Sequence, residues 1–479
     1  MEDNHINIAI QFADLVRTTL GPRGMNKMVV NEGAGEVILT NDGATIIANV
    51  KGGNPIVDLF KNLAISQETA IGDGTSTAVI IAGQLLQNAL TLINKGLHPT
   101  TIINGYNLAK VRSMSFLEKT REPGDKEKII RTAFGTKISP DIISHFCSIL
   151  QKVKDFENLK QYKIPFSDPK ESQIFNGYVF SGFTINERMD KKVKGKIAVL
   201  DFPSNIESDN FQVTNADELI KIENMKKQMK MKIINELVRC KVDCVLYTDT
   251  NPEFESYMTD KGLTGIVVFQ RDHLDGICKA THARVCSCVD DIKTHLGEGE
   301  VTYKKQLVGN QGHIFIEAKN SEMETLVLNG PTEQTLNEIE RAVQDVVGLL
   351  KHETDCVIGA GSVEVSLSLD LRDFANDIGG KEQLAIEKFA ESIEAIPMII
   401  AENAGLDAIE ILTNLKTSHK NGQTDLGVDI VKGISDARER GIIEPVLVKI
   451  HAINAASNVA NLILKLDKIL IGEDGAKNE

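Results

Sequence analysis

The sequence predicts a multidomain α/β protein, in which a mostly helical domain made from both chain ends carries an inserted module of strands and helices. Helical stripes of apolar residues occupy the first 120 residues and return from about residue 332. Between them, short β-rich runs alternate with a helical stripe, which is typical of an α/β unit. The length of 479 residues exceeds that of a usual single domain and suggests about three domains.

The N-terminal stretch has apolar side chains spaced by three and four, as one face of a helix requires: Ile8, Phe12, Leu15 and Val16. Gly21-Pro22 ends this pattern. A second helix is expected to be capped by Thr75 or Ser76 and to run to about Asn94, before Gly96.

Pro99 opens a third predicted helix, which reaches the charged segment 119–128 at a domain boundary. The middle of the chain contains five runs with strand character: 196–202, 244–249, 265–270, 313–318 and 324–330. Between the first two runs lies a helical stripe of Ile222, Met225, Met229, Ile233 and Leu237. We expect this stripe to face the core; a surface for protein partners is the alternative, because Met suits adaptable contacts.

The C-terminal stretch is predicted to be helical again, up to a last helix near 451–467 and an acidic tail. Its clearest stripe places four apolar side chains on one face: Leu384, Phe389, Ile393 and Ile396.

Composition narrows the classes of function. A net charge of −14 argues against general nucleic-acid binding, and the sequence contains neither an obvious membrane span nor a signal peptide. Seven scattered cysteines fit reduced thiols in the cytosol. A zinc site is the alternative for one group of side chains, Cys278, His282, Cys286 and Cys288, but the alternation in 285–289 favours a strand.

Two similar motifs, TNDGATI at 40–46 and GDGTST at 72–77, place Asp-Gly and a Thr before an apolar run. The free N–H groups at a helix start suit a phosphate, and glycines let the backbone approach it. Asp73 would then face the phosphate only through a cation, which indicates Mg²⁺. A plain helix cap is the structural alternative for each motif.

Two common nucleotide motifs do not fit. The chain has no Gly-Lys-Ser/Thr sequence of a Walker A loop, and Gly359-Ala360-Gly361 lacks the third glycine of a dinucleotide fingerprint. The residues alone therefore indicate a nucleotide or phosphate site of non-standard type, and a Rossmann-type oxidoreductase is disfavoured.

Five stretches in order resemble a group II chaperonin: LGPRGMNKMVV, TNDGATI, GDGTST, GAGSVE and AIPMIIAENAG. Within that family the chain is most similar to subunits of the eukaryotic cytosolic chaperonin (TRiC/CCT), and most of all to the theta type. The stretches NDGATI and AVIIAGQLL instead resemble other subunits, such as delta. The resemblance implies three domains: an equatorial ATPase domain (1–125 and 358–479), an intermediate hinge domain (126–178 and 323–357) and an apical substrate-binding domain (179–322).

The resemblance also implies roles for individual residues in binding ATP and Mg²⁺. Asp42 and Asp345 would position the attacking water, and Asp73 would be the magnesium ligand. The other residues implied to contact the nucleotide are Leu20, Gly21, Pro22, Gly43, Gly74, Thr75, Ser76, Thr77, Gly361 and Glu444, the last at the ribose. From the sequence alone, Asp345 is simply a polar position on an amphipathic helix.

The function that the resemblance implies is ATP-dependent protein folding by a cytoplasmic double ring. The partners would be paralogous subunits and unfolded clients of the actin and tubulin class, and neither nucleic acid nor membrane is expected. A nucleotide-binding ring subunit that hydrolyses ATP only weakly is the alternative, because Ala360 replaces a glycine near the nucleotide and its methyl group would crowd the ligand.

Overall fold

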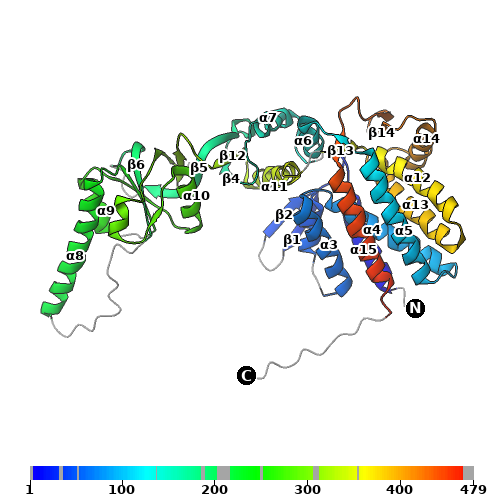
Figure 1. The fold of residues 1–479 in the computed structure, drawn as a ribbon, viewed down its shortest axis with the longest axis horizontal. Coiled ribbons are helices and arrows are strands. Elements are labelled where there is room, and N and C mark those ends of the chain that lie inside the picture. The colour runs from blue at the N-terminus through cyan, green and yellow to red at the C-terminus, as the bar shows by residue number, and fades with distance from the viewer. Residues whose placement is uncertain are drawn as a thin grey trace, which may run out of the picture. The chain divides into compact units, whose positions relative to one another are not determined.

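The computed structural model describes residues 4–31, 36–50, 53–135, 137–184, 189–201, 216–248, 252–305, 312–352 and 355–467. The chain divides into two compact units. Unit 1 contains residues 1–151 and 332–479, and unit 2 contains residues 152–331. The predicted insertion of an α/β module between two helical parts of the chain is therefore confirmed, and the helices before and after the module lie in unit 1 (Figure 1). The separate hinge domain stays a prediction.

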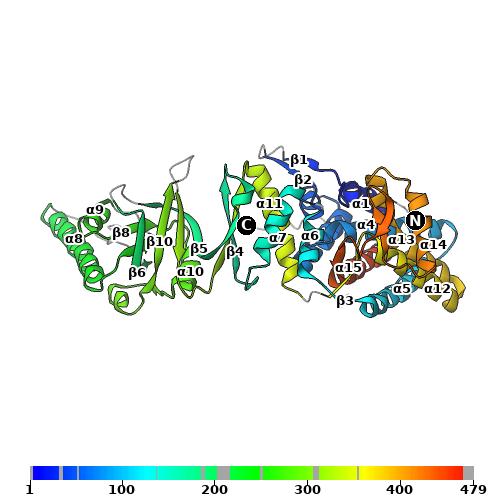
Figure 2. The same cartoon turned by 90° about the horizontal axis from the view of Figure 1, so that it is seen from above.

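Unit 1 is mostly helical. Its helices are α1 (Asn4–Arg17), α2 (Gly43–Asn49), α3 (Pro55–Ile71), α4 (Thr75–Asn94), α5 (Pro99–Thr120), α6 (Lys126–Phe134), α7 (Pro140–Leu150), α11 (Glu333–Leu350), α12 (Ser362–Ile378), α13 (Gly380–Asn403), α14 (Ala408–Lys420) and α15 (Val446–Leu464). Helix α4 packs against α1, α3, α13 and α15, so segments from both ends of the chain form one core around it (Figure 1). Helices α6 and α7 pack together, and α11 packs on α6 (Figure 2).

Helices α4 and α15 are long and apolar enough to cross a membrane by length and composition. Most of each apolar window is nevertheless buried inside unit 1, 67% for α4 and 56% for α15. A helix that is apolar on every side is expected at the centre of a large core. Packing therefore accounts for the apolar character of both helices.

In the part of unit 1 that the structure describes, three small antiparallel sheets accompany the helices. Strands β1 (Lys27–Asn31) and β2 (Glu36–Thr40) pair, as do β14 (Leu426–Asp429) and β15 (Gly433–Asp436). The third sheet has the order β16-β13-β3 and joins three distant segments: β3 (Glu122–Pro123), β13 (Asp355–Ile358) and β16 (Ile443–Pro445). It places the glycines that follow β13 beside β16.

Unit 2 is an α/β module around one sheet. Its strands are β4 (Leu159–Pro165), β5 (Gln173–Thr184), β6 (Lys192–Leu200), β7 (Cys244–Tyr247), β8 (Thr264–Val267), β9 (Val285–Cys286), β10 (Gly297–Lys305), β11 (Gly312–Glu317) and β12 (Glu324–Gly330). Its helices are α8 (Ala216–Arg239), α9 (Pro252–Asp260), α10 (Asp272–Thr281) and the short 3₁₀ turns η1 (Pro169–Glu171) and η3 (Val289–Lys293). Strands β6, β7 and β8 are parallel, with α8 and α9 between them in sequence, as the α/β prediction requires.

The pairing order of the sheet is β11-β10-β6-β7-β8-β5-β12-β4, and β11 also pairs with β5. This extra pairing closes a ring of six strands, which leaves few open edges. All five predicted strand runs appear as β6, β7, β8, β11 and β12. The pattern missed β4, β5 and β10, whose mixed polar sequences are half-buried.

Several local predictions are wrong. The N-cap of α4 is Gly74, and Thr75 is its first helical residue. Leu15 and Leu384 are exposed on their helices, at 39% and 42%. On α8, Met225 and Met229 are exposed while Ile233 and Leu237 are buried, so the stripe faces the core only in its second half; Ile222 lies outside the described side chains.

The predicted strand at 285–289 ends at Cys286, and η3 starts at Val289. Cys286 is buried and Cys288 is exposed, so the two thiols do not share a face. Burial raises the pKa of Cys278 to about 11 and that of Cys286 to about 12, which disfavours the thiolates that zinc requires. Among the described residues, no group of three or more His, Cys, Asp or Glu side chains is arranged to hold a metal ion. The zinc alternative is therefore not supported.

Candidate functional site

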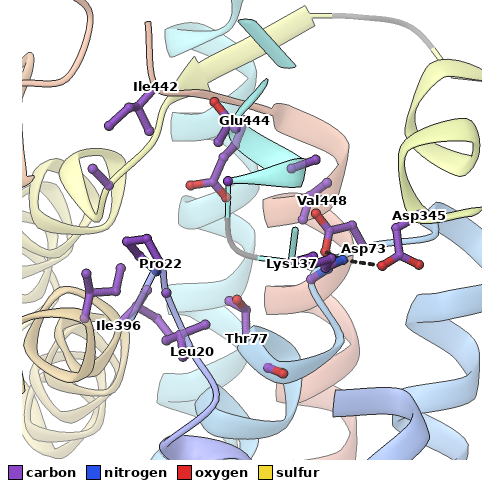
Figure 3. Close-up of a pocket in the computed structure, with 18 of the residues that line it drawn as sticks. Leu20, Pro22, Asp73, Thr77, Lys137, Asp345, Ile396, Ile442, Glu444 and Val448 are labelled. Atoms are coloured by element: carbon purple, nitrogen blue, oxygen red, sulfur yellow. Dashed lines mark hydrogen bonds and ion pairs between the residues drawn. The ribbon is translucent and has the colours of Figure 1, made fainter. Parts of the chain in front are cut away.

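Unit 1 contains a cavity of about 360 Å³ that is lined by segments from both ends of the chain. Every residue that the sequence analysis proposed for the site lines it: Leu20, Gly21, Pro22, Asp42, Gly43, Asp73, Gly74, Thr75, Ser76, Thr77, Asp345, Gly361 and Glu444. Figure 3 shows Asp73 and Asp345 at one end, with Glu444 and Ile442 at another. The fold therefore brings together residues that are more than 400 positions apart in sequence.

One end of the cavity is the N-terminus of α4. Gly74 is the N-cap with φ +82°, and the Asp73 carboxylate accepts a hydrogen bond from its backbone N–H at 2.8 Å. Because Gly74 has no side chain, it cannot cap the first N–H groups of α4, which stay available to an anion. Thr75, Ser76 and Thr77 line the cavity beside them.

The two Asp-Gly motifs meet in space at this end. A Cβ atom on Gly43 would lie 2.4 Å from Ser76 Oγ, so glycine is required where the first motif approaches the second. A Cβ atom on Gly72 would lie 3.1 Å from the Cα of Gly348 on α11 and 3.3 Å from the backbone oxygen of Asp345. Close packing at this glycine, which has φ +88°, lets α11 approach the loop.

Asp42 has a structural role that the sequence analysis kept as an alternative. It is the N-cap of α2, and its carboxylate accepts from the N–H groups of Ala44 and Thr45 at 3.3 and 2.8 Å. The Thr45 hydroxyl also donates to it at 2.6 Å. These contacts fix the carboxylate at the cavity wall; its contact with water stays a prediction.

Asp345 is a buried acid on α11, with 5% of its surface exposed, and so it is not a solvated surface residue. Its carboxylate forms an ion pair with Lys137, and Lys137 Nζ also lies 3.2 Å from Asp73 Oδ1 (Figure 3). Burial raises the pKa of Asp345 well above its usual value; Lys137 opposes this shift, and the nearby acids add to it. A buried carboxyl group with a raised pKa is suited to accept a proton.

Sequence reasoning missed Lys137, which follows α6 in a turn and donates its backbone N–H to the Phe134 carbonyl at 2.9 Å. Burial alone would lower the pKa of this lysine, but Asp345 and Asp73 overcome that effect and raise it. Lys137 therefore places its ammonium group beside both Asp345 and Asp73 in the cavity. No motif or periodicity around residue 137 points to this role, because only the fold brings the turn to the cavity.

Glu68 on α3 was also missed. Its carboxylate accepts a hydrogen bond from the Thr75 hydroxyl at 3.1 Å, and it lines the same cavity. Burial raises the pKa of Glu68, and the neighbouring Asp42 adds to the shift. Its position one helix turn before the GDG motif is the only signal that the sequence offered.

The donor set at this end fits a magnesium ion that is held mainly by phosphate oxygens. Mg²⁺ in nucleotide sites is typically bound by one or two carboxylates, with phosphate oxygens and water completing its octahedron. Asp73 supplies such a carboxylate at the mouth of the α4 N-terminus. A cage made from protein side chains alone is absent among the described residues.

The opposite end of the cavity has an apolar wall and one acid. Ile396, Ile400, Val428 and Ile442 line it, with Glu444. The loop Gly359-Ala360-Gly361 forms the edge, and Ala360 has φ +55°, which is unusual for a residue with a side chain. A Cβ atom on Gly427 would lie 2.9 Å from the Ala360 methyl group, so glycine at 427 makes room for that methyl.

The chain is similar to known proteins over nearly its whole length. Residues 12–474 match the model of the TCP-1/cpn60 chaperonin family. Thermosome subunit alpha of Thermoplasma acidophilum is 31% identical, over 98% of this chain and 91% of the relative. The thermosome subunit alpha of Archaeoglobus fulgidus is 33% identical over 97% and 91%, and thermosome subunit 1 of Haloferax volcanii is 34% identical over 96% and 87%.

Proposed function

The chain belongs to the TCP-1/cpn60 chaperonin family of ATPases, in its group II branch, and from this premise we propose that its cavity in unit 1 binds and hydrolyses Mg²⁺-ATP. The observation that carries the proposal is the meeting of Asp345, Asp73 and Lys137 at the N-terminus of α4. An anion site, a metal ligand and a buried base are together the parts that phosphoryl transfer to water needs.

In this proposal the phosphates lie against the N–H groups and hydroxyls of residues 74–77, and Asp73 holds the magnesium ion. When bound there, that ion would neutralise charge on the phosphates. Asp345 orients the attacking water and accepts its proton, and Asp42 faces the same water. Lys137 supplies a further positive charge beside the phosphates. The nucleotide contacts four further residues of the lining, Leu20, Gly21, Pro22 and Gly361. Gly43 lies near its phosphates, and Glu444 accepts hydrogen bonds from the ribose hydroxyls.

The proposal extends to the assembly. We expect a cytoplasmic double ring in which ATP hydrolysis closes a lid over unfolded clients, and in which paralogous subunits are the neighbours. Asp345 lies on α11, which the resemblance assigns to the hinge domain (323–357). Closure of that domain over the equatorial site would therefore couple chemistry to the motion of the ring. The theta type within TRiC/CCT, and clients of the actin and tubulin class, rest on the resemblance of the sequence stretches.

The test uses the purified native particle. We expect Mg²⁺-dependent ATP hydrolysis and ATP-dependent recovery of a chemically unfolded client, with chelation of Mg²⁺ abolishing both. ATP binding with no hydrolysis at this chain's own site would favour the alternative, a structural ring subunit. Absence of any nucleotide binding at the site would refute the proposal.

A further inference from the structure

A second buried charge cluster lies at the ribose end of the cavity, and the proposed mechanism does not use all of it. Lys449 on α15 places its Nζ 2.7 Å from Glu364 Oε1 on α12 and 2.6 Å from Glu444 Oε2 on β16. Glu364 and Lys449 are almost fully buried, at 3% and 5% exposure. Three elements that are distant in sequence thus meet at one ammonium group.

This cluster is costly to bury. Two carboxylates share one ammonium, so a negative charge remains in excess. The attraction between buried ions often does not compensate for the free energy of hydration that they lose. Among the described residues, neither carboxylate oxygen of Glu364 makes a well-aligned hydrogen bond. Apolar side chains of similar volume would fill the same space at lower cost. The cluster is therefore better explained by a function than by stability.

The geometry shows what the cluster holds in place. Glu444 pairs with Val357 across the β16-β13 sheet, and this register sets it beside the loop that follows β13. Lys449 holds its Oε2 atom. A Cβ atom on Gly359 would lie 2.8 Å from the other oxygen, Oε1, so this oxygen faces the glycine loop at the cavity edge. Both Glu444 and Lys449 line the cavity.

We infer that Lys449 is a positioning residue, which holds the Glu444 carboxylate ready to accept hydrogen bonds from the ribose hydroxyls, and that Glu364 anchors Lys449. The inference rests on the proposed nucleotide site and deepens it, because it makes the site selective for ribonucleotides. Burial raises the pKa of Glu444. The Lys449 ammonium opposes this shift and so favours the charged carboxylate, which accepts hydrogen bonds best.

The experiment compares binding of ATP, 2′-deoxyATP and 3′-deoxyATP to the assembled protein in Mg²⁺, at this chain's own site. A hydrogen bond to a charged group corresponds to about 10- to 100-fold in affinity, so the wild type should prefer ATP over at least one deoxy analogue by that factor. Lys449→Met should remove the preference, and Glu444→Gln should remove it as well.

Two further variants separate positioning from general damage. The double variant Glu364→Gln with Lys449→Met leaves no unpaired charge at position 364, and it should also lose the preference for ATP. It takes the place of the single variant Lys449→Met if the single variant does not assemble. Lys416→Met is the matched control: Lys416 pairs with the buried Glu394 at 2.7 Å in the same unit, outside the cavity lining, and should keep the wild-type preference.

Each outcome is decisive. A wild-type preference that persists in Lys449→Met or in the double variant overturns the inference, and so does a wild type that binds ATP and both deoxy analogues equally. Equal weakening of all three nucleotides in the variants indicates a merely structural role and also overturns it. A wild type that binds none of the nucleotides refutes the proposed function itself.

Discussion

At the scale of single residues, Asp345 separates nucleotide binding from chemistry. Asp345→Asn keeps the shape of the side chain but cannot accept a proton, so ATP binding should persist while hydrolysis slows by about 100- to 10,000-fold. Lys137 keeps Asp73 as a partner in this variant. Nucleotide analysis of this site after a timed incubation should find ATP where the wild type holds ADP.

Glu333→Gln is the control for this substitution, because Glu333 lies exposed in the first turn of the same helix. It should hydrolyse ATP at the wild-type rate. Normal ADP formation in Asp345→Asn would return Asp345 to the role of a buried structural partner of Lys137.

Asp73 is expected to act through the metal. Asp73→Asn keeps an oxygen for the Gly74 N–H but weakens the bond to Mg²⁺. The wild type should bind ATP more tightly in Mg²⁺ than in a chelator, and the variant should lose most of this difference, about tenfold or more. Titration of ATP with and without Mg²⁺ measures it. An undiminished response to Mg²⁺ would exclude Asp73 as the ligand.

Ala360 tests the alternative of a weakly hydrolysing subunit. Ala360→Gly removes the strain of a left-handed backbone conformation, which should stabilise the folded state by about 1 kcal/mol. Glycine also gives the unfolded chain more conformational entropy, which lowers the free energy of unfolding by a similar amount. The free energy of unfolding should therefore change by less than about 1 kcal/mol. Because the methyl group lies close to Gly427, we expect no change in ATP affinity or turnover; a clear rise in either would mean that the methyl group crowds the nucleotide.

At the scale of elements, the core of unit 1 depends on a close contact between α1 and α4. A Cβ atom on Gly83 would lie 2.3 Å from the Cβ of Ala13, so any larger side chain must push the two helices apart. Gly83→Val should destabilise the protein by about 1–3 kcal/mol. Gln87→Val, at an exposed position of the same helix, is the control for placing a β-branched valine in α4. Apparent unfolding midpoints under identical heating would compare them, and equal midpoints would contradict the packing argument.

Helices and strands were predicted correctly where the apolar pattern of the sequence is strong. The predictions were incomplete or wrong where contacts with distant segments determine the structure. The runs at 244–249 and 324–330 are strands β7 and β12 because both are buried on both faces. Strand β5 was not predicted, because its sequence mixes polar and apolar residues without a clear alternation. Its strand conformation is stabilised by pairing with β8, β11 and β12. Leu384 lies five positions before Phe389, a spacing that turns it away from the helix face shared by Phe389, Ile393 and Ile396, and it is exposed.

At the scale of the whole molecule, the proposal predicts an assembly. The hairpin β1–β2 exposes large apolar side chains, including Met28 at 67% and Val30 at 54%, which fits a surface that other subunits cover. Native material should therefore migrate as a particle many times the 52.5 kDa of one chain, together with several similar chains. Native mass measurement with identification of the chains tests this. Recovery from cell extract only as a free monomer would contradict it.

The sequence by itself determined the α/β insertion between helical ends, and its motifs predicted two phosphate-binding loops. These features are local: Asp-Gly turns, glycines and helix starts are written in consecutive residues, and their physical roles follow from backbone geometry. The resemblance then added residues such as Asp345 and Glu444, which carry no local signal.

Only the tertiary structure decided which charges meet. Lys137 joins Asp345 and Asp73, and Lys449 joins Glu364 and Glu444, across separations that no periodicity spans. An isolated lysine in a sequence is usually a solvated surface residue. It becomes a buried partner only when several elements exclude water around it and supply the carboxylates, and that depends on the packing of the whole unit.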